Sequence, residues 1–393
     1  IVLTPRGGGT GTNAQSLTDG IVVDTSRHMN HVLEINTDEC WARVESGVVK
    51  DQLNAALKPY GLFFAPDLST SNRATIGGMI NTDASGQGSC VYGKTRDHVL
   101  ELTTVLLDGS VMETRALDTE EENAICQGDD RCAQIHNLAV EIQQEHQALI
   151  DEVFPPLNRC LTGYDLAHIR DEENRLNLNN ILCGSEGTLG FVAQAKLNLL
   201  PIPHYSALVV VKYSDFNNSL RDATELMRAN PTSIETIDSK VLTLAMNDFI
   251  WDQVEEFFDA AKNIRLSDDD SPLQGINLVE FTGNSEQQLQ DGIDQLTAIL
   301  KQKIGHSSNN TDFEASEYTP SGRLGYSIAM GNDAVKRIWA MRKRAVGLLG
   351  NAAGEARPVP FVEDTAVPPE NLADFILEFR EILDGYQLDY GMF

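Results

Sequence analysis

Glycine-rich segments are the parts of this 393-residue sequence whose residue types could hold a large anionic ligand. The first, residues 5–11 (PRGGGTG), follows the apolar residues Ile1, Val2 and Leu3. Glycine has no Cβ and tolerates positive φ, so successive backbone N–H groups can turn toward one anion. This segment therefore predicts either a phosphate-binding nest or a tight glycine turn.

Two later segments have the same character. Residues 66–88 are rich in small polar residues and glycine, and residues 184–190 (GSEGTLG) precede an apolar run. Small side chains pack poorly on one another but let the backbone lie against a planar ligand, while Ser, Thr and Asn supply hydrogen bonds. The alternative for residues 66–88 is an irregular surface loop, although Ile76, Met79 and Ile80 would anchor it.

Two nucleotide-binding patterns are present but lack their structural context. Residues 9–14 match a dinucleotide fingerprint, which must open a long helix, yet a strand-like run begins at Ile21. Residues 88–95 match a P-loop, and residues 105–108 resemble its partner strand. A P-loop must follow a buried strand and open a helix, whereas residues 99–107 read as a strand. A P-loop NTPase is therefore a disfavoured alternative.

Composition excludes several classes of function. Lys and Arg number 30 against 58 Asp and Glu, and a net charge of −28 repels nucleic acid and anionic lipid. No apolar run reaches the roughly 18 residues of a membrane span. Six cysteines without a CxxC pair favour a reducing cytosol, and we expect a cytoplasmic protein, with peripheral attachment to the inner membrane as an alternative. The chain has no initiator Met and opens inside a strand-like run, so we expect an incomplete product.

The pattern of elements predicts two domains of an α+β protein. A helical acidic insertion at about 117–180 interrupts the first domain, residues 1–203, and prolines 201 and 203 mark its end. In the second domain, residues 204–393, strands at 207–211 and 276–281 alternate with helices at 219–229 and 287–303. This alternation predicts an antiparallel sheet backed by helices.

A helical projection of residues 335–349 places Arg342 at the centre of an apolar face. The apolar face is formed by Val335, Ile338, Trp339, Ala345, Val346 and Leu349, and a solvated basic face by Lys336, Arg337, Lys343 and Arg344. A buried guanidinium is costly unless it is paired, and its fork fits a carboxylate. Arg342 is therefore predicted to bind a substrate carboxylate, with an ion pair to a neighbouring Asp or Glu as the alternative.

Together these pieces resemble the FAD-linked oxidase family with a PCMH-type (vanillyl-alcohol-oxidase-like) flavin domain, and its 2-hydroxy-acid dehydrogenase branch. The motifs that carry the resemblance are residues 5–11, 74–78, 92–97, 163–166 and 184–190. The resemblance implies a PCMH-type domain, a substrate (cap) domain and non-covalent FAD, since no His follows the glycines. It implies that FAD contacts Arg6, Gly7, Gly8, Gly9, Thr10, Gly11, Pro66, Asp67, Ser69, Thr75, Gly77, Gly78, Asn81, Ser85, Gly86, Glu186, Gly187, Gly190 and Val192.

The resemblance also implies the reaction. D-lactate or D-2-hydroxyglutarate would be oxidised to the 2-oxo acid by hydride transfer to flavin N5, with Arg342 on the carboxylate. Lys343 and Thr365 are weaker substrate candidates. The electron acceptor would be a quinone, an electron-transfer flavoprotein or a fused iron–sulfur domain, and a homodimer is compatible with this interpretation. The similarity is greatest to long bacterial members, in which an iron–sulfur domain and a histidine-bearing metal motif would follow Phe393.

A FAD-binding module without turnover is the second hypothesis, because the histidines of that metal motif lie outside the sequence. The histidines within it, including His28, His31, His136 and His146, form no compelling metal-ligand cluster. We therefore predict no metal site in these residues.

Overall fold

A computed structural model of the chain describes residues 1–11, 14–157, 163–258, 273–304, 322–349 and 365–392. The chain separates into two compact units, Ile1–Ile202 and Pro203–Phe393. Within the described residues, no helix is both long and apolar enough to span a membrane.

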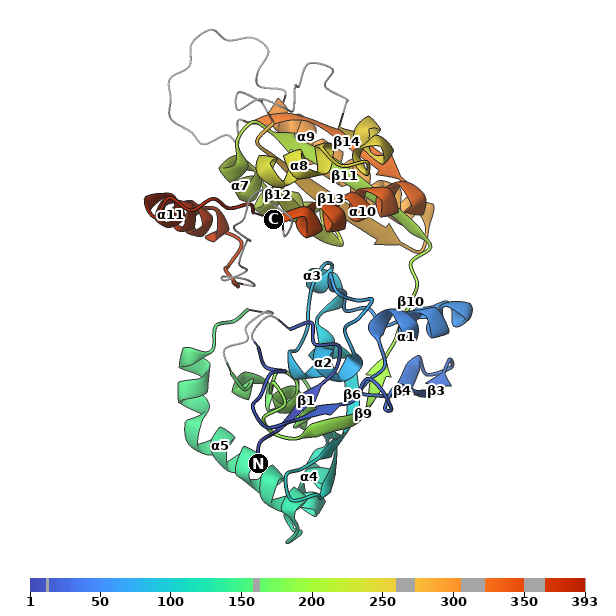
Figure 1. Ribbon diagram of the computed structural model, residues 1–393, viewed down its shortest axis with the longest axis vertical. Helices are drawn as coiled ribbons and strands as arrows, with labels where there is room; N and C mark the ends of the chain where they lie inside the picture. Colours follow the sequence, from blue (N-terminus) through green and yellow to red (C-terminus); the bar gives the residue numbers. More distant parts are fainter. Residues whose placement is uncertain (12–13, 158–162, 259–272, 305–321, 350–364, 393) are drawn as a thin grey trace. The chain divides into compact units, whose positions relative to one another are not determined.

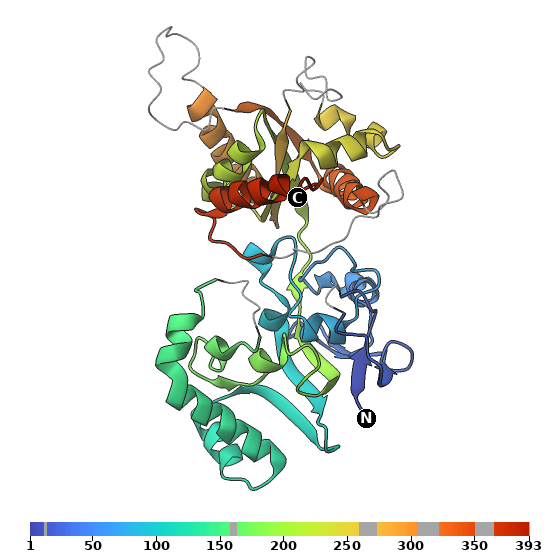
Figure 2. The same cartoon turned by 60° about the vertical axis from the view of Figure 1, so that its left-hand side comes forward.

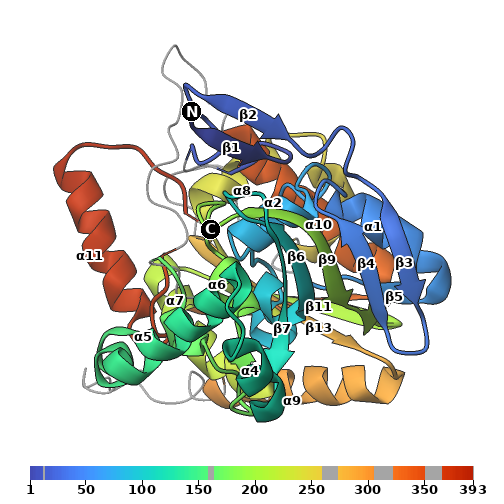
Figure 3. The ribbon, with the colours of Figure 1, turned by 90° about the horizontal axis from the view of Figure 1, so that it is seen from below.

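The first unit is built on a six-stranded antiparallel sheet (Figure 3). In sheet order its strands are β3 (Val32–Asn36), β4 (Trp41–Glu45), β9 (Phe191–Asn198), β6 (Val99–Val105), β7 (Val111–Leu117) and β8 (Leu176–Asn177). Alternate residues of β4, Ala42 and Val44, are fully buried, as expected for a sheet with one face on a core. Because β9 lies between β4 and β6, residues near 190 lie beside residues near 45 and 104.

Two helices cover this face of the sheet. They are α1 (Lys50–Leu57) and α2 (Ile76–Asn81), and their buried Leu53, Leu57, Ile76, Met79 and Ile80 share one core with the sheet. The anchors expected from Ile76, Met79 and Ile80 are therefore present, and residues 74–81 are not a free surface loop.

Smaller elements complete this core region. A parallel strand pair, β1 (Leu3–Arg6) and β2 (Ile21–Asp24), is separate from the large sheet (Figure 3). The antiparallel pair of β5 (Leu62–Phe63) and β10 (Leu200–Pro201) and the short helix α3 (Ser89–Tyr92) complete it. The connection from β1 to β2 contains the first glycine-rich segment.

The acidic insertion is helical, as expected, but its main helix is longer than the sequence indicated. Helix α4 (Thr119–Cys126) packs on α5 (Arg131–Val153), and α6 (Asn179–Leu182) follows (Figure 2). Asp118 and Asp130 cap α4 and α5 by accepting hydrogen bonds from their first-turn N–H groups. Arg170 holds the insertion together through two hydrogen bonds to Glu122, each 2.8 Å long.

The second unit is a four-stranded antiparallel sheet with helices on both faces (Figure 1). Its strands, in sheet order, are β12 (Ser233–Asp238), β13 (Gly275–Gly283), β11 (Tyr205–Tyr213) and β14 (Arg323–Met330). Val209 and Val211 share a core with α9 (Glu286–Ile304) and the end of α7 (Phe216–Leu226), whereas Leu208 and Val210 face α8 (Ser239–Met246) and α10 (Asn332–Leu349). Helix α11 (Leu372–Gly385) packs on α7. The strands and helices predicted for this region are therefore present; β11, β13 and α9 are longer than expected, and α7 begins and ends three residues earlier.

Candidate functional site

The first glycine-rich segment leaves β1 and passes directly over the start of α2. A Cβ on Gly7 would lie 2.0 Å from Oγ1 of Thr75, and a Cβ on Gly8 would lie 2.2 Å from the carbonyl oxygen of Arg73. Gly9 has φ +63°, a conformation that favours glycine. Glycine is therefore required for the close approach of this segment to residues 73–75.

The second segment forms the N-terminus of α2. Thr75 is its N-cap, and its side chain accepts a hydrogen bond from the Gly78 N–H at 3.4 Å. The Gly77 N–H donates to the Ser46 carbonyl oxygen at 2.7 Å, and a Cβ on Gly77 would lie 2.7 Å from Cβ of Ser46. The helix start is thereby fixed against the end of β4.

The third segment contacts both of the others. The Glu186 N–H donates to the Asn81 carbonyl oxygen at 2.8 Å, and a Cβ on Gly187 would lie 2.6 Å from Cγ of Pro5. Burial raises the pKa of the Glu186 carboxyl group, although a hydrogen bond from Gln15 acts in the opposite direction. Three segments that are far apart in the sequence thus meet at one place in the first unit.

The other predicted cofactor residues differ in how deeply they are buried and in which residues they contact. Pro66 is buried, and a Cβ on Gly86 would lie 2.3 Å from the carbonyl oxygen of Asp67, so residues 66–67 lie beside residue 86. The Asp67 carboxylate also accepts a 2.8 Å hydrogen bond from the buried Lys50 ammonium. Arg6, Gly11 and Ser69 are exposed, Thr10, Ser85 and Gly190 are half-buried, and Val192 is in the core of the sheet.

The P-loop-like residues have a structural role instead. The Lys94 ammonium lies 2.7 Å from the Asp83 carboxylate, and both side chains are at least 95% buried. Residues 95–98 form one 3₁₀ turn before β6, so no α-helix begins after Lys94, where a P-loop requires one. This geometry agrees with the rejection of the P-loop interpretation.

A second buried ion pair links two of the motifs on which the resemblance depends. The Arg96 guanidinium pairs with the Asp165 carboxylate, which also accepts a 2.8 Å hydrogen bond from His168 Nδ1. Burial, together with the nearby Arg96 and Lys94 cations, lowers the pKa of His168. The ion pair joins residues 92–97 to residues 163–166.

Family models match both units of the chain. Residues 1–115 match a FAD binding domain, and residues 202–393 match the C-terminal domain of FAD linked oxidases. The chain belongs to the FAD-linked oxidase family. The predicted α+β class, with a PCMH-type FAD-binding domain and a domain with an antiparallel sheet, is confirmed.

Relatives narrow the position of this chain within the family. It is 58% identical over 393 residues to D-2-hydroxyglutarate dehydrogenase of Pseudomonas putida and 48% identical over 394 residues to the Escherichia coli protein of that name. Both matches cover 100% of this chain and 37% of the relative's length. A glycolate oxidase subunit of Bacillus subtilis is 23% identical over 398 residues, which is 100% of this chain and 65% of that protein.

A solved structure shares the fold. Alkyldihydroxyacetonephosphate synthase matches with a TM-score of 0.58 at 17% identity, over 89% of this chain and 51% of that one. At this identity the likeness concerns the fold alone.

The steric features of the three segments fit FAD, the cofactor of this family. Gly7, Gly8, Gly77 and Gly187 lie where a Cβ would meet another atom at 2.0–2.7 Å, so the backbones of all three segments come close together. The backbone N–H groups of residues 7–11 belong to the donor type that binds a diphosphate. Residues 6–11, 75–81 and 186–187 are therefore the part of the structure that would hold FAD.

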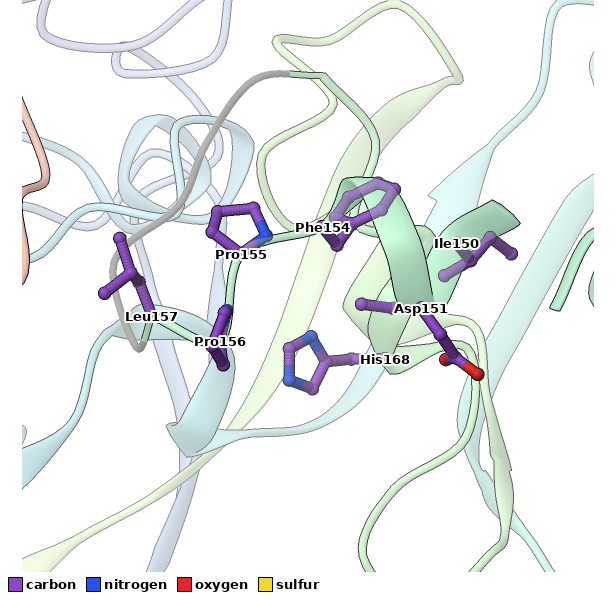
Figure 4. Close-up of a pocket in the computed structure, with 8 residues that line it drawn as sticks. Ile150, Asp151, Phe154, Pro155, Pro156, Leu157 and His168 are labelled. Atoms are coloured by element: carbon purple, nitrogen blue, oxygen red, sulfur yellow. The ribbon is translucent and has the colours of Figure 1, made fainter. Parts of the chain in front are cut away.

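A separate pocket of about 410 Å³ lies at the end of α5 (Figure 4). It is lined by Ile150, Asp151, Phe154, Pro155, Pro156, Leu157, Ala167 and His168. None of the residues predicted to bind FAD or substrate lines it.

Arg342 lies on α10 and is paired. Its Nε donates a hydrogen bond to Oε2 of Glu235 on β12, and the two side chains are 16% and 19% exposed. The neighbouring Trp339 donates from its indole Nε1 to Oε1 of Glu280 on β13 at 3.2 Å. The ion pair that the sequence left as an alternative is therefore observed, and together with the Trp339 hydrogen bond it places two carboxylates of the sheet beside this helix.

Two residues of the predicted basic face of α10 are exposed to solvent and also have partners. Arg337 and Arg344 do not simply project into solvent, because they pair with Glu256 and Asp248 at 2.9 Å and lie over the rings of Phe257 and Phe249. The apolar face also includes the fully buried Met341, which the projection omitted. Lys343 and Thr365 are exposed, and residues 361–363 lie outside the described part of the chain.

Two of the histidines considered in the sequence, His31 and His136, have ordinary structural partners. His31 Nδ1 lies 2.7 Å from the Glu45 carboxylate, and the buried His136 bonds the Cys132 carbonyl oxygen at 2.7 Å. Across the described ranges, no group of three or more His, Cys, Asp or Glu side chains could hold a metal ion.

Sequence reasoning missed Gln15, Ser46, Thr104 and Glu235, which lie beside the predicted site residues. Gln15, Ser46 and Thr104 approach glycines of the three segments, and Glu235 pairs with Arg342. Only the fold brings Ser46 to Gly77 of the second segment and Thr104 to Gly190 of the third, and no local pattern in the sequence marks them.

Proposed function

We propose that this chain supplies the FAD-binding and substrate-binding parts of a dehydrogenase that oxidises a D-2-hydroxy acid to the 2-oxo acid. The observation that carries the proposal is the 48–58% identity, over the whole chain, to four bacterial proteins named D-2-hydroxyglutarate dehydrogenase. These relatives favour D-2-hydroxyglutarate as the substrate, with D-lactate as the second candidate because more distant relatives carry that name.

The three glycine-rich segments would hold FAD without a covalent bond. Backbone N–H groups of residues 6–11 would face the diphosphate, and residues 66–69, 75–81 and 85–86 would line the flavin. Residues 186–192 would complete the site through their backbone. When bound, FAD supplies at N5 an acceptor for the hydride that leaves C2 of the substrate. These segments would exclude water and hold the flavin in a fixed orientation toward the substrate. Hydride transfer would then proceed like a reaction within one molecule.

Arg342 would bind the substrate carboxylate. Its planar guanidinium fork can form two parallel hydrogen bonds with a carboxylate, which fixes orientation as well as supplying charge. The hydrogen bond from Nε to Glu235 supports this role, because a neighbouring carboxylate limits the rotamers of a long, flexible side chain. Lys343 and Thr365 stay weaker substrate candidates.

Electrons would leave the flavin to a quinone, an electron-transfer flavoprotein or an iron–sulfur domain of the same protein. A cytoplasmic homodimer, with or without peripheral attachment to the inner membrane, is the assembly we propose. The side chains that bind the divalent metal implied by the resemblance would belong to residues outside this sequence.

Flavin absorbance and dye reduction test the proposal in two steps. The purified chain should show the absorbance bands of bound flavin. The flavin-loaded protein that contains this chain should reduce a dye with D-2-hydroxyglutarate and fail with the L enantiomer. Flavin binding without turnover on any 2-hydroxy acid would contradict the dehydrogenase and favour a FAD-binding module. A protein that binds no flavin would contradict both.

A further inference from the structure

A small set of buried polar atoms lacks hydrogen-bond partners in the described part of the chain. Four side-chain atoms belong to this set, and three of them are in the first unit: Oε1 of Gln15, Oγ of Ser46 and Oγ1 of Thr104. Leaving a buried polar group unpaired costs about 1–3 kcal/mol, so such atoms are rare, and a bound ligand or a buried water can supply the missing partner.

Each of these three atoms belongs to a side chain that touches a glycine of a different FAD segment. A Cβ on Gly11 would lie 2.8 Å from Oε1 of Gln15. A Cβ on Gly77 would lie 2.7 Å from Cβ of Ser46, and a Cβ on Gly190 would lie 2.6 Å from Cγ2 of Thr104. The side chains that carry the unpaired atoms therefore lie beside all three segments that meet in the first unit.

Ser46 and Thr104 lie on either side of β9, next to consecutive residues of that strand. The Ser46 N–H donates to the carbonyl oxygen of Ala193, and Thr104 pairs with Val192. Ser46 is 2% exposed and Thr104 is fully buried. Both hydroxyl groups can donate as well as accept, so each can bond most polar atoms of a ligand.

The amide of Gln15 has a fixed orientation. Its side chain forms a hydrogen bond with the Glu186 carboxylate, and only the amide N–H₂ group can donate to a carboxylate. Oε1 is therefore directed elsewhere, and as an acceptor it requires a donor. In FAD, the hydroxyl groups of the ribose and of the ribityl chain flank the diphosphate on both sides.

We propose that Gln15, Ser46 and Thr104 are further FAD-binding residues, whose unpaired oxygen atoms form hydrogen bonds with the cofactor. This inference rests on the proposed function, since it requires that the three segments bind FAD. Gln15 accepts from a ribose or ribityl hydroxyl group, because it lies beside Gly11 of the diphosphate-binding segment. Ser46 and Thr104 bond polar atoms of the cofactor near Gly77 and Gly190.

Buried water is the competing partner for the same atoms. The two explanations differ in what a variant changes. If FAD is the partner, removing the hydroxyl group weakens FAD binding. If water is the partner, removing the hydroxyl group changes the stability of the apoprotein and leaves FAD binding as it was.

The test compares Ser46→Ala, Thr104→Val and Gln15→Met with wild type in the full chain. FAD affinity is measured by quenching of flavin fluorescence on titration of apoprotein, and apoprotein stability by urea unfolding. Each variant should weaken FAD binding by about tenfold, the effect of one hydrogen bond to a buried group. Thr104→Ser keeps the hydroxyl group and should restore wild-type affinity.

Thr114→Val is the matched control, because Oγ1 of this buried threonine already donates to Oδ1 of Asn179 at 2.6 Å. It should lower apoprotein stability without changing FAD affinity. Variants of Ser46 and Thr104 that bind FAD as wild type does would overturn this inference alone. A wild-type chain that binds no FAD would overturn it together with the proposed function.

Discussion

Nε of Arg342 donates a hydrogen bond to Oε2 of Glu235, which ties helix α10 to strand β12 in the second unit. Both side chains are more than four-fifths buried, so the pair is shielded from solvent. The proximity of Glu235 has two consequences for a substrate-binding Arg342. It orients the guanidinium, and it opposes the approach of a second carboxylate by charge repulsion. A substrate that binds here must therefore gain enough from the arginine to offset this repulsion.

The substrate role of Arg342 predicts a selective loss of catalysis. Arg342→Lys keeps the charge but not the planar fork, and it should lower kcat/KM for D-2-hydroxyglutarate by about 100-fold, equivalent to one charge-assisted hydrogen-bond pair. Flavin content should not change. Steady-state kinetics of the flavin-loaded protein and its flavin absorbance measure the two effects.

Arg344→Ala is the control on the same helix. Arg344 pairs with Asp248 on the surface, so its loss should leave kcat/KM close to wild type. If Arg342→Lys and Arg344→Ala behave alike, Arg342 is only the structural partner of Glu235.

Alanine substitutions at two adjacent glycines of α2 should have opposite effects on the stability of the apoprotein. In Gly77→Ala, the new Cβ would meet Cβ of Ser46 at 2.7 Å and its carbonyl oxygen at 3.0 Å, and such overpacking should cost about 2 kcal/mol. In Gly78→Ala, the nearest atom is Oγ1 of Thr75 at 3.4 Å, and Ala is favoured over Gly in a helix by about 1 kcal/mol. Urea unfolding of the two apoproteins should separate them.

The Gly78→Ala variant also tests whether this residue belongs to the FAD site. Because Gly78 is exposed at the N-terminus of α2, a methyl group there should reduce FAD affinity by about tenfold or more while the apoprotein stays folded. Full FAD affinity in Gly78→Ala would remove this residue from the cofactor site.

Much of the architecture was predictable, because local patterns report it directly. Short apolar runs that alternate with helical stretches identified β11 and β13, and the small-residue motifs identified the three segments that meet around Pro5, Thr75 and Gly187. The projection of α10 identified Arg342 as a partly buried cation with an anionic partner.

The remaining features depend on contacts between residues that are distant in the sequence. Glu235 is one of many acidic residues, and only the packing of α10 on β12 selects it as the partner of Arg342. The partners of Arg337 and Arg344 were not predicted, because a helical projection contains no neighbouring elements such as the segment with Asp248 and Glu256. Lys94 likewise matched a phosphate-binding pattern, whereas its partner is Asp83.

Breaking the buried Lys94–Asp83 ion pair should lower the stability of the protein strongly and should not change ATP binding. Lys94→Met leaves the Asp83 carboxylate buried without its cation, which should cost about 3 kcal/mol. Asp83→Asn combined with Lys94→Met removes both charges and should recover part of this loss. Urea unfolding measures stability and calorimetry measures ATP binding. ATP binding by the wild type that Lys94→Met abolishes would revive the P-loop interpretation.

The Glu122–Arg170 pair predicts how the stability of the acidic insertion depends on pH. The hydrogen bonds from Arg170 lower the pKa of Glu122 below its ordinary value of 4.5. A carboxyl group whose pKa is lowered by folding stabilises the protein above its unfolded pKa, and this contribution is lost as the pH falls through the folded pKa. Glu122→Gln should therefore cost about 1 kcal/mol at pH 7, and the difference from wild type should shrink below pH 4.5. Urea unfolding at pH 7, 5 and 3.5 measures this difference.

Glu120→Gln, an exposed change on the same helix, is the control and should show a small difference at all three pH values. A Glu122→Gln effect that is equally large at pH 3.5 and pH 7 would mean that the hydrogen-bond geometry, rather than the charge of Glu122, stabilises the insertion.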